Sequence, residues 1–310
     1  MKKDDLRREH VNGADGRFSK PRGLRNGRTG TALATMAGLM LAQPVLAQDD
    51  ELPAGDATAP TVVVTATRFP VDVSTVGSSI SVITADDLQQ QQTRFVSDIL
   101  REVPGVAVSR SGTFGTQTQV RIRGAEGNQT LVIIDGVEVN DPAGGNEFDF
   151  GQLLSSDIER IEVLRGPQSI LYGSNSIGGV INIITKKGEK GVTATARAEG
   201  GSFYTFDGGA SVSGGNDLAN AYLGVSGYRT AGINISKNGG ENDGYDNITL
   251  NHTLNVKPLD ILELSGSLRY VDAELQYDDF GEETDSRGFI IPNDANLKAK
   301  VTNLSGRAQA

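Results

Sequence analysis

The chain has 310 residues, a formal net charge of −10 at pH 7, no cysteine and two histidines. Disulfides, thiolate nucleophiles and metal sites built from cysteines or from several histidines are therefore excluded. The acidic charge argues against nucleic acid as a partner.

Residues 1–47 have the composition of a secretory signal. A basic stretch reaches Arg28, an apolar run follows, and Val45-Leu46-Ala47 forms a small-residue cleavage site before Gln48. We expect this segment to be removed on export. Because it carries nine basic and four acidic residues, its removal leaves a net charge of −15.

Residues 48–69 form a leader that contains a short β-branched segment between Pro60 and Pro70. Its members are Thr61, Val62, Val63, Val64, Thr65 and Ala66. This composition predicts an extended strand. The strand could pair with the edge of a partner's sheet or form the first strand of the folded segment that follows, and the residues alone leave both open.

Residues 70–187 are typical of a compact α+β domain. Thr84 and Asp87 have the spacing of a helix cap, and apolar residues recur at helical spacing from Phe95 to Val103, until Pro104-Gly105 ends the helix. Asp135-Gly136 lies between two short apolar runs, which is a strong hairpin signal. Residues 158–184 predict two apolar strands joined by a turn rich in glycine and small polar residues.

Two arginines in this domain each stand beside a glycine at the end of an apolar strand. These are Arg123, before Gly124, and Arg165, before Gly166. A partly buried guanidinium needs carboxylate partners to offset its desolvation. The alternative is that both are ordinary surface arginines.

Residues 188–310 show period-two alternation of apolar and polar side chains. We expect strands at 192–200, 204–212, 219–227, 247–256 and 262–270, and a weaker sixth at 300–308. The connectors at 230–246 and 272–297 are long and the others are short, as in a barrel with short periplasmic turns and longer outer loops. In such a barrel the apolar parity faces lipid and the polar parity faces the lumen. A soluble β-sandwich is the alternative.

Five segments in order carry a resemblance to a known family. They are residues 61–66, 98–106, 122–124, 131–137 and 158–184, the last beginning Ile158-Glu-Arg-Ile-Glu-Val-Leu-Arg-Gly-Pro167. Together they resemble TonB-dependent outer-membrane receptors, most closely the cobalamin receptors, although siderophore receptors share nearly all of these motifs. The implied fold is an α+β plug domain followed by the first strands of an antiparallel transmembrane β-barrel. A plugged receptor barrel has about 22 strands, whereas only five clear strands and a weaker sixth are expected here, so the barrel is expected to be incomplete.

The resemblance also assigns roles to the segments described above. Residues 61–66 would be the box that TonB grasps from the periplasm, and Arg123 and Arg165 would form a plug latch with glutamates of the barrel wall. Those glutamates would lie beyond Ala310. The chain is thus expected to be the N-terminal portion of a longer receptor, or else a non-transporting remnant.

The predicted ligand contacts lie on two plug loops, residues 110–118 and 140–150. Their candidate side chains are Ser111, Phe114, Thr116, Asn140, Asn146 and Phe148. Aromatic and amide groups suit a bulky ligand with apolar and amide edges, such as cobalamin, and they suit a siderophore nearly as well. Glycine-rich loops can equally be simple connectors.

Acidic residues gather in the two long connectors, and their carboxylates could bind calcium: Asp243, Asp246, Asp278 and Asp279. Their spacing matches no EF-hand, and solvated surface acids are the alternative. No other cofactor is expected.

The sequence predicts a transporter and not an enzyme, since no nucleophile–base pair or phosphate loop stands out. The expected function is uptake of cobalamin across the outer membrane, with TonB and membrane lipid as partners. A ferric-siderophore receptor and a secreted adhesive β-protein are the alternatives.

Overall fold

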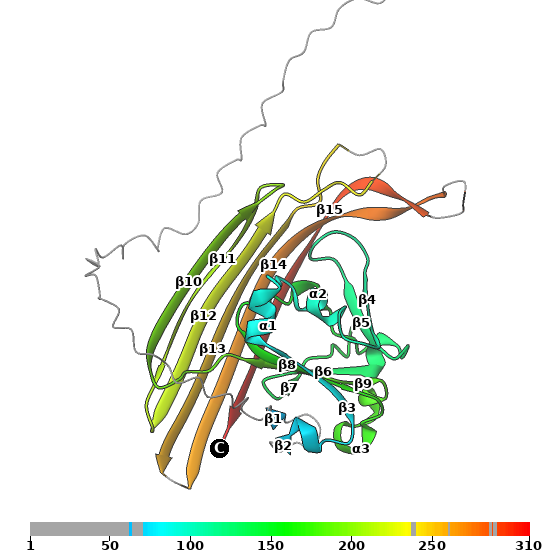
Figure 1. Cartoon of the computed structure of the whole chain (residues 1–310). Coiled ribbons are helices and arrows are strands. Elements are labelled where there is room, and N and C mark those ends of the chain that lie inside the picture. The colour runs from blue at the N-terminus through cyan, green and yellow to red at the C-terminus, as the bar shows by residue number, and fades with distance from the viewer. Residues whose placement is uncertain (1–61, 64–70, 237–239, 260, 285–286, 288–289) are drawn as a thin grey trace, which may run out of the picture. The chain divides into compact units, whose positions relative to one another are not determined.

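The computed structural model describes residues 62–63, 71–236, 240–259, 261–284, 287 and 290–310. The expected signal segment lies outside these residues. Ala57–Ala310 forms one compact unit, in which an α+β domain that ends at Thr185 precedes a sheet of long strands that begins at Gly191 (Figure 1). Within the described residues, no helix has the length and apolar character needed to cross a membrane.

A five-stranded sheet forms the centre of the α+β domain. Its order is β3-β8-β9-β6-β7, and the strands are β3 Ser79–Thr84, β8 Ile158–Arg165, β9 Gly179–Thr185, β6 Thr130–Ile134 and β7 Val137–Glu138. β8 and β9 pair antiparallel, as the apolar runs of residues 158–184 predict. β6 and β9 pair parallel. Ile161, Ile181 and Ile183 are fully buried in the core on this sheet.

The predicted hairpin at Asp135-Gly136 is confirmed. Both residues have positive φ, 48° and 79°, which is the conformation of a type I′ turn. Ile134 pairs with Val137 across the turn. The Asp135 carboxylate also accepts hydrogen bonds from the backbone N–H of Thr185 (2.9 Å) and from its hydroxyl (2.7 Å), so the turn is fixed to β9.

The helical pattern of residues 85–103 gives two short helices, α1 Ala85–Gln90 and α2 Val96–Leu100. Thr84 caps α1, and its hydroxyl and the Asp87 side chain form the expected capping box. Gln92 has a φ of 50°, so the chain turns between the helices. The other described helices are shorter still: α3 Ser169–Tyr172 and single 3₁₀ turns at Val73–Thr75, Gly127–Gln129, Phe150–Gln152 and Ser174–Ser176.

Two small strand pairs complete the domain. β1 Val62–Val63 pairs with β2 Val71–Asp72, and β4 Val106–Arg110 pairs with β5 Thr118–Ile122. The β4–β5 hairpin carries the first predicted ligand loop at its tip.

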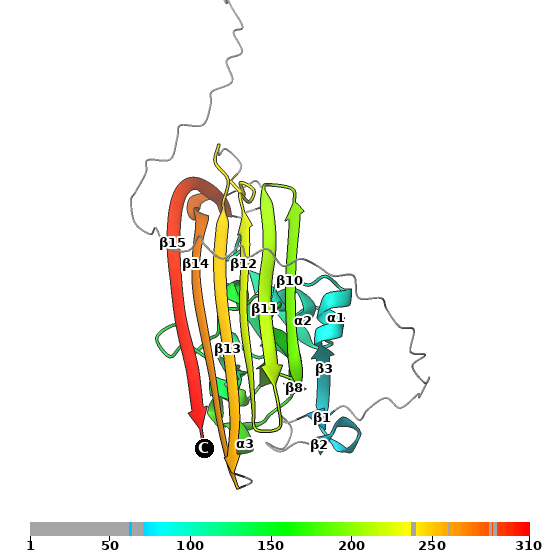
Figure 2. The ribbon, with the colours of Figure 1, turned by 90° about the vertical axis from the view of Figure 1, so that its left-hand side faces the viewer.

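Six antiparallel strands follow in sequence order (Figure 2). They are β10 Gly191–Gly201, β11 Thr205–Gly215, β12 Ala219–Thr230, β13 Tyr245–Leu259, β14 Leu262–Thr284 and β15 Ile290–Gln309. Each pairs with the next, and β10 and β15 do not pair with each other, so the described strands form an open sheet. We call this sheet the wall and the α+β domain the plug.

The prediction of a long connector at residues 272–297 is wrong. β14 continues to Thr284 and β15 begins at Ile290, so most of that segment is a paired extension of the two strands. Backbone pairing such as Ala273 with Val301 continues past the predicted end of the strand. The apolar positions change face here, because Leu264 and Leu268 are exposed whereas Val271, Ala273 and Leu275 are buried. A search for one constant apolar face therefore ended the strand too early.

The predicted faces of the wall are clear on β13. Ile248 and Leu254 are 52% and 42% exposed on one face. On the other face every second side chain is buried and polar: Asn247, Thr249, Asn251 and Thr253. The inner face of β14 departs from this pattern above Arg269, where buried Val271, Ala273 and Leu275 pack with Phe95 of the plug. The inner face of the wall is thus polar in one zone and apolar in another.

Candidate functional site

The tip of the β4–β5 hairpin lies against aromatic side chains of the wall. The Phe114 ring stacks on Phe95 with centroids 5.4 Å apart and lies 5.7 Å from Tyr228 of β12. The Arg110 guanidinium lies 5.2 Å from the centroid of the Phe114 ring. Gly115 has a φ of 80°, and a Cβ on it would lie 2.2 Å from the Tyr245 ring. The tip is therefore held against the wall.

This packing separates the three ligand contacts predicted in the first loop. Phe114 is half-buried in the aromatic cluster. Thr116 is buried, and its hydroxyl donates to the Thr113 carbonyl oxygen at 2.7 Å. Only Ser111 of the three is exposed.

The second predicted loop is organised by one buried amide. Asn140 accepts a hydrogen bond from the backbone N–H of Val132 (2.8 Å) and donates to the carbonyl oxygens of Thr130 and Asn146, both at 3.0 Å. Asn146 is half-buried with a φ of 62°. The Phe148 ring meets Phe150 edge-on at 4.8 Å and packs on the plug core. Asn140 and Phe148 thus have partners inside the plug.

The two predicted latch arginines lie near each other at the end of the plug sheet. Arg165 donates to the Pro104 carbonyl oxygen (2.7 Å) and to the Ser81 hydroxyl (2.9 Å), both in the plug. Arg123 has a φ of 53°, and its backbone N–H donates to the Gly105 carbonyl oxygen at 2.7 Å. A Cβ on Gly166 would lie only 3.1 Å from Arg123 Nη1. Gly166 therefore leaves room for the Arg123 guanidinium.

Two residues of the predicted TonB box are described. Val62 pairs with Asp72 and Val63 with Val71, and Val63 is fully buried. Thr61, Val64, Thr65 and Ala66 lie outside the described residues. The described pair therefore lies in a strand of this chain, as the first-strand alternative expects.

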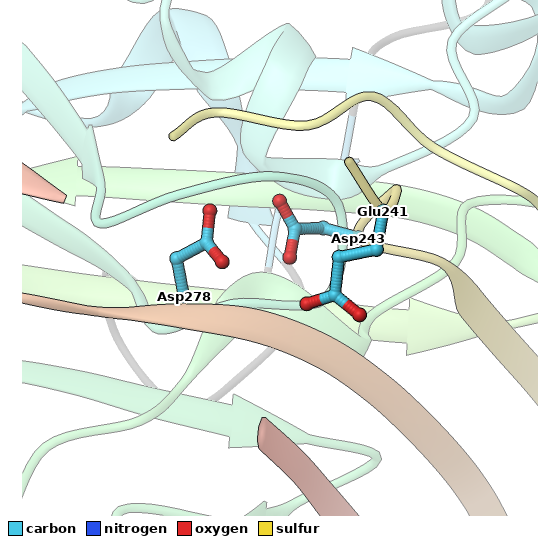
Figure 3. A group of neighbouring side chains, drawn as sticks. All are labelled: Glu241, Asp243 and Asp278. Carbon is cyan, nitrogen blue, oxygen red and sulfur yellow. The ribbon is translucent and has the colours of Figure 1, made fainter. Parts of the chain in front are cut away.

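Three acidic side chains converge beside the upper part of β14. The carboxylate oxygens of Glu241, Asp243 and Asp278 lie within 4.8 Å of one another (Figure 3). Asp243 and Asp278 are 1% and 6% exposed. The backbone fixes Asp243, because its N–H donates to the Ile233 carbonyl oxygen (3.2 Å) and its carboxylate accepts from the Ile235 N–H (3.3 Å). Hard oxygen donors at this separation have the chemistry of a calcium site.

The structure thus brings together two of the four predicted metal ligands. Asp246 instead forms an ion pair with Arg229 at 3.1 Å, with both side chains exposed. The side chain of Asp279 lies outside the described residues. Glu241 takes the third place, and only its position in the same acidic connector pointed to it.

Comparisons with known proteins agree with this architecture. Residues 72–180, about a third of the chain, match the family model of the TonB-dependent Receptor Plug Domain. The solved structure of the Pseudomonas aeruginosa receptor FpvA bound to heterologous pyoverdines is similar to this chain, with a TM-score of 0.65 and 19% identity over 80% of this chain and 33% of that one.

Two further solved structures have the same fold. The ferric-catecholate import receptor Fiu from Escherichia coli K12 has a TM-score of 0.54 and 21% identity, over 67% of this chain and 29% of that one. The siderophore receptor PirA from Acinetobacter baumannii has a TM-score of 0.50 and 22% identity, over 74% and 44%. The chain spans less than half the length of each of these three relatives. Residues 72–180 therefore match a TonB-dependent receptor plug domain, and the chain shares the fold of a plug followed by antiparallel wall strands with part of these receptors. These similarities support an outer-membrane location.

Proposed function

We propose that this chain is the N-terminal part of a TonB-dependent receptor that takes up a ferric siderophore across the outer membrane. The observation that carries the proposal is the plug-domain match at residues 72–180, joined to a wall whose β13 face toward the plug is polar and whose other face is apolar. The wall alternation is that of a barrel in lipid around a filled lumen.

The proposed mechanism breaks no covalent bond. A ligand binds at the outer loops and the plug apex, residues 61–66 become available to TonB in the periplasm, and force transmitted through TonB rearranges the plug. Edge pairing of an extended segment with a partner sheet is a known mode of peptide recognition. The short β1–β2 pairing, two residues long, leaves little to be broken when that segment is taken up.

The proteins of similar fold favour a siderophore over cobalamin. FpvA is bound to pyoverdines, PirA is a siderophore receptor, and Fiu is a ferric-catecholate import receptor. The predicted contacts that we keep as ligand residues are Ser111, which is exposed beside the hairpin tip, and the half-buried Asn146 of the second loop. Phe114 would hold the tip of the β4–β5 hairpin in place through its contacts with Phe95 and Tyr228.

Competition binding tests this assignment. Outer membranes that contain the protein are titrated with a ferric catecholate, a ferric pyoverdine and cobalamin, each competing with the others. We expect saturable binding of a ferric siderophore and none of cobalamin. Cobalamin binding that no iron chelate displaces would overturn the siderophore assignment, and uptake that persists without TonB would overturn the receptor proposal itself.

Cobalamin remains a second candidate because of the acidic cluster. By resemblance, cobalamin receptors are thought to order their outer loops with calcium before the ligand binds, and Glu241, Asp243 and Asp278 converge in such a region. This candidate requires that cobalamin binding depend on calcium.

A further inference from the structure

Asp157 is a buried carboxylate of the plug that none of the predicted roles uses. It lies directly before β8 and is 6% exposed. Its oxygens accept hydrogen bonds from the Tyr222 hydroxyl at 2.6 Å and from the Asn251 amide at 2.7 Å, and the Ser226 hydroxyl lies at 3.4 Å. These three donors belong to β12 and β13 of the wall.

The wall residues around Asp157 form a socket with a glycine as its floor. Gly224 pairs with Asn251 across β12 and β13, and it lies between Tyr222 and Ser226 on the face toward the plug. A Cβ on Gly224 would lie 2.6 Å from Asp157 Oδ1 and 2.7 Å from the Tyr222 hydroxyl. Only glycine therefore leaves room for the carboxylate between these strands.

The chemistry of the socket matches a charged group. A carboxylate removed from water is costly unless donors replace its hydration, and hydrogen bonds to a charged acceptor are stronger than neutral ones. The socket supplies hydroxyl and amide donors at short distances. The hydrogen bonds of Asp157 therefore stabilise the arrangement in which the plug contacts β12 and β13.

The neighbouring plug residues are fixed to β13, one of these two strands. The Tyr245 hydroxyl donates to the Gln152 side-chain oxygen at 2.7 Å, and the Asn247 amide donates to the Gln152 carbonyl oxygen at 3.2 Å. Thr253 donates to the Lys186 carbonyl oxygen at 3.2 Å. Tyr245, Asn247, Asn251 and Thr253 alternate along β13, so one face of one strand contacts this part of the plug.

We propose that Asp157 and its socket are a plug-to-wall latch, separate from Arg123 and Arg165. The carboxylate keeps plug residues 152–157 on β12 and β13 when no ligand is bound. Its role in transport rests on the proposed function, but the latch itself is a property of the resting protein and can be tested without ligand or TonB.

The test uses a single cysteine placed on the covered face of the wall. The chain has no native cysteine, and Thr249 on β13 is 2% exposed. Thr249→Cys is labelled with a maleimide in outer membranes, and the rate is compared between backgrounds. Gly224→Ala fills the socket without changing the plug. Gly227→Ala is the matched control, because its Cβ would meet its nearest atom at an ordinary 3.5 Å.

We expect Gly224→Ala to raise the labelling rate by roughly tenfold or more, since the latch limits local opening, and Gly227→Ala to leave it unchanged. Equal rates in the two alanine variants would overturn the proposal. If Gly224→Ala fails to reach the membrane, Asp157→Asn decides. It removes the negative charge from the acceptor of the Tyr222 and Asn251 hydrogen bonds and should raise the labelling rate. Adding Asn251→Asp returns a carboxylate to the pair and should restore the original rate. Absence of that rescue would also overturn the latch.

Discussion

Single residues divide into those whose role is local in sequence and those whose role is set by distant neighbours. The Thr84–Asp87 cap and the Asp135-Gly136 turn could be predicted, because both partners lie within a few residues. Asn140 and Asp157 could not. An amide that binds its own loop from within has the same sequence signature as one that faces a ligand, and Asp157 meets Tyr222 65 residues later.

The cap of α1 gives a prediction on stability and its pH dependence. Thr84→Ala should lower the free energy of unfolding by about 1 kcal/mol, measured by urea denaturation, with Thr84→Ser as the control that keeps the cap. Hydrogen bonds from the Thr84 backbone N–H and then from its hydroxyl hold the pKa of Asp87 below its usual value.

Because the folded pKa of Asp87 is the lower one, its contribution is fully present above the unfolded pKa of about 3.9 and is lost as pH falls through the folded value. Asp87→Asn should flatten the stability curve in that acidic window. If the free energy of unfolding changes with pH in the same way with and without this substitution, Asp87 does not contribute to the pH dependence of stability.

Gly115 gives a second prediction at this scale. Gly115→Ala would place its Cβ 2.2 Å from the Tyr245 ring. This overpacking should destabilise the protein by about 1–3 kcal/mol, in addition to the cost of a positive φ at an alanine. Gly145→Ala is the control, with a φ of 76° and open space around its Cβ. Thermal unfolding compares the two. A Gly115 variant as stable as the control would mean that the tip of the β4–β5 hairpin does not press on the wall.

At the scale of elements, periodicity predicted the six strands but not their lengths. The prediction follows one apolar face only, and in β14 the apolar positions change from even numbers up to Tyr270 to odd numbers from Val271. Residues 273–284 continue β14 through backbone pairing with β15. That extension carries Asp278 to Glu241 and Asp243.

The convergence predicts a calcium dependence that discriminates among the acids. Asp243→Asn and Asp278→Asn should each weaken calcium binding by about tenfold or more, because each removes one charged oxygen ligand. Asp246→Asn should not, since that side chain pairs with Arg229. Titration calorimetry on the purified protein measures the three variants. An equal loss in all three, or no saturable binding by the unaltered protein, would rule out this site.

At the scale of the whole molecule, the order of plug and wall was predictable and their contacts were not. The five motifs and the alternating strands each follow from short stretches of sequence. Gln152 and Lys186 meet β13, and Asp157 meets β12 and β13 together, across separations of 65 to 95 residues that no single stretch of sequence encodes. The apolar zone of β14 around Phe95 escaped for the same reason.

The two faces of the wall predict how charge is tolerated. Leu254→Arg, on the exposed face of β13, should cost about 2–4 kcal/mol of folding into lipid vesicles if it lies near the midplane of the bilayer. Leu259→Arg, at the end of the same strand, should cost about 0–1 kcal/mol. Equal costs for the two variants would place this face away from lipid.

The junction between plug and wall limits how far the plug can move. β9 ends at Thr185 and β10 begins at Gly191, so five residues join the last strand of the plug to the first strand of the wall. Even fully extended, this link reaches only about 20 Å. The end of β9 therefore stays close to the start of β10 even when other parts of the plug move. In the uptake proposed above, a passage for the ligand would come from rotation of the plug about this link or from unravelling of earlier plug strands, because the link keeps the end of β9 within reach of β10.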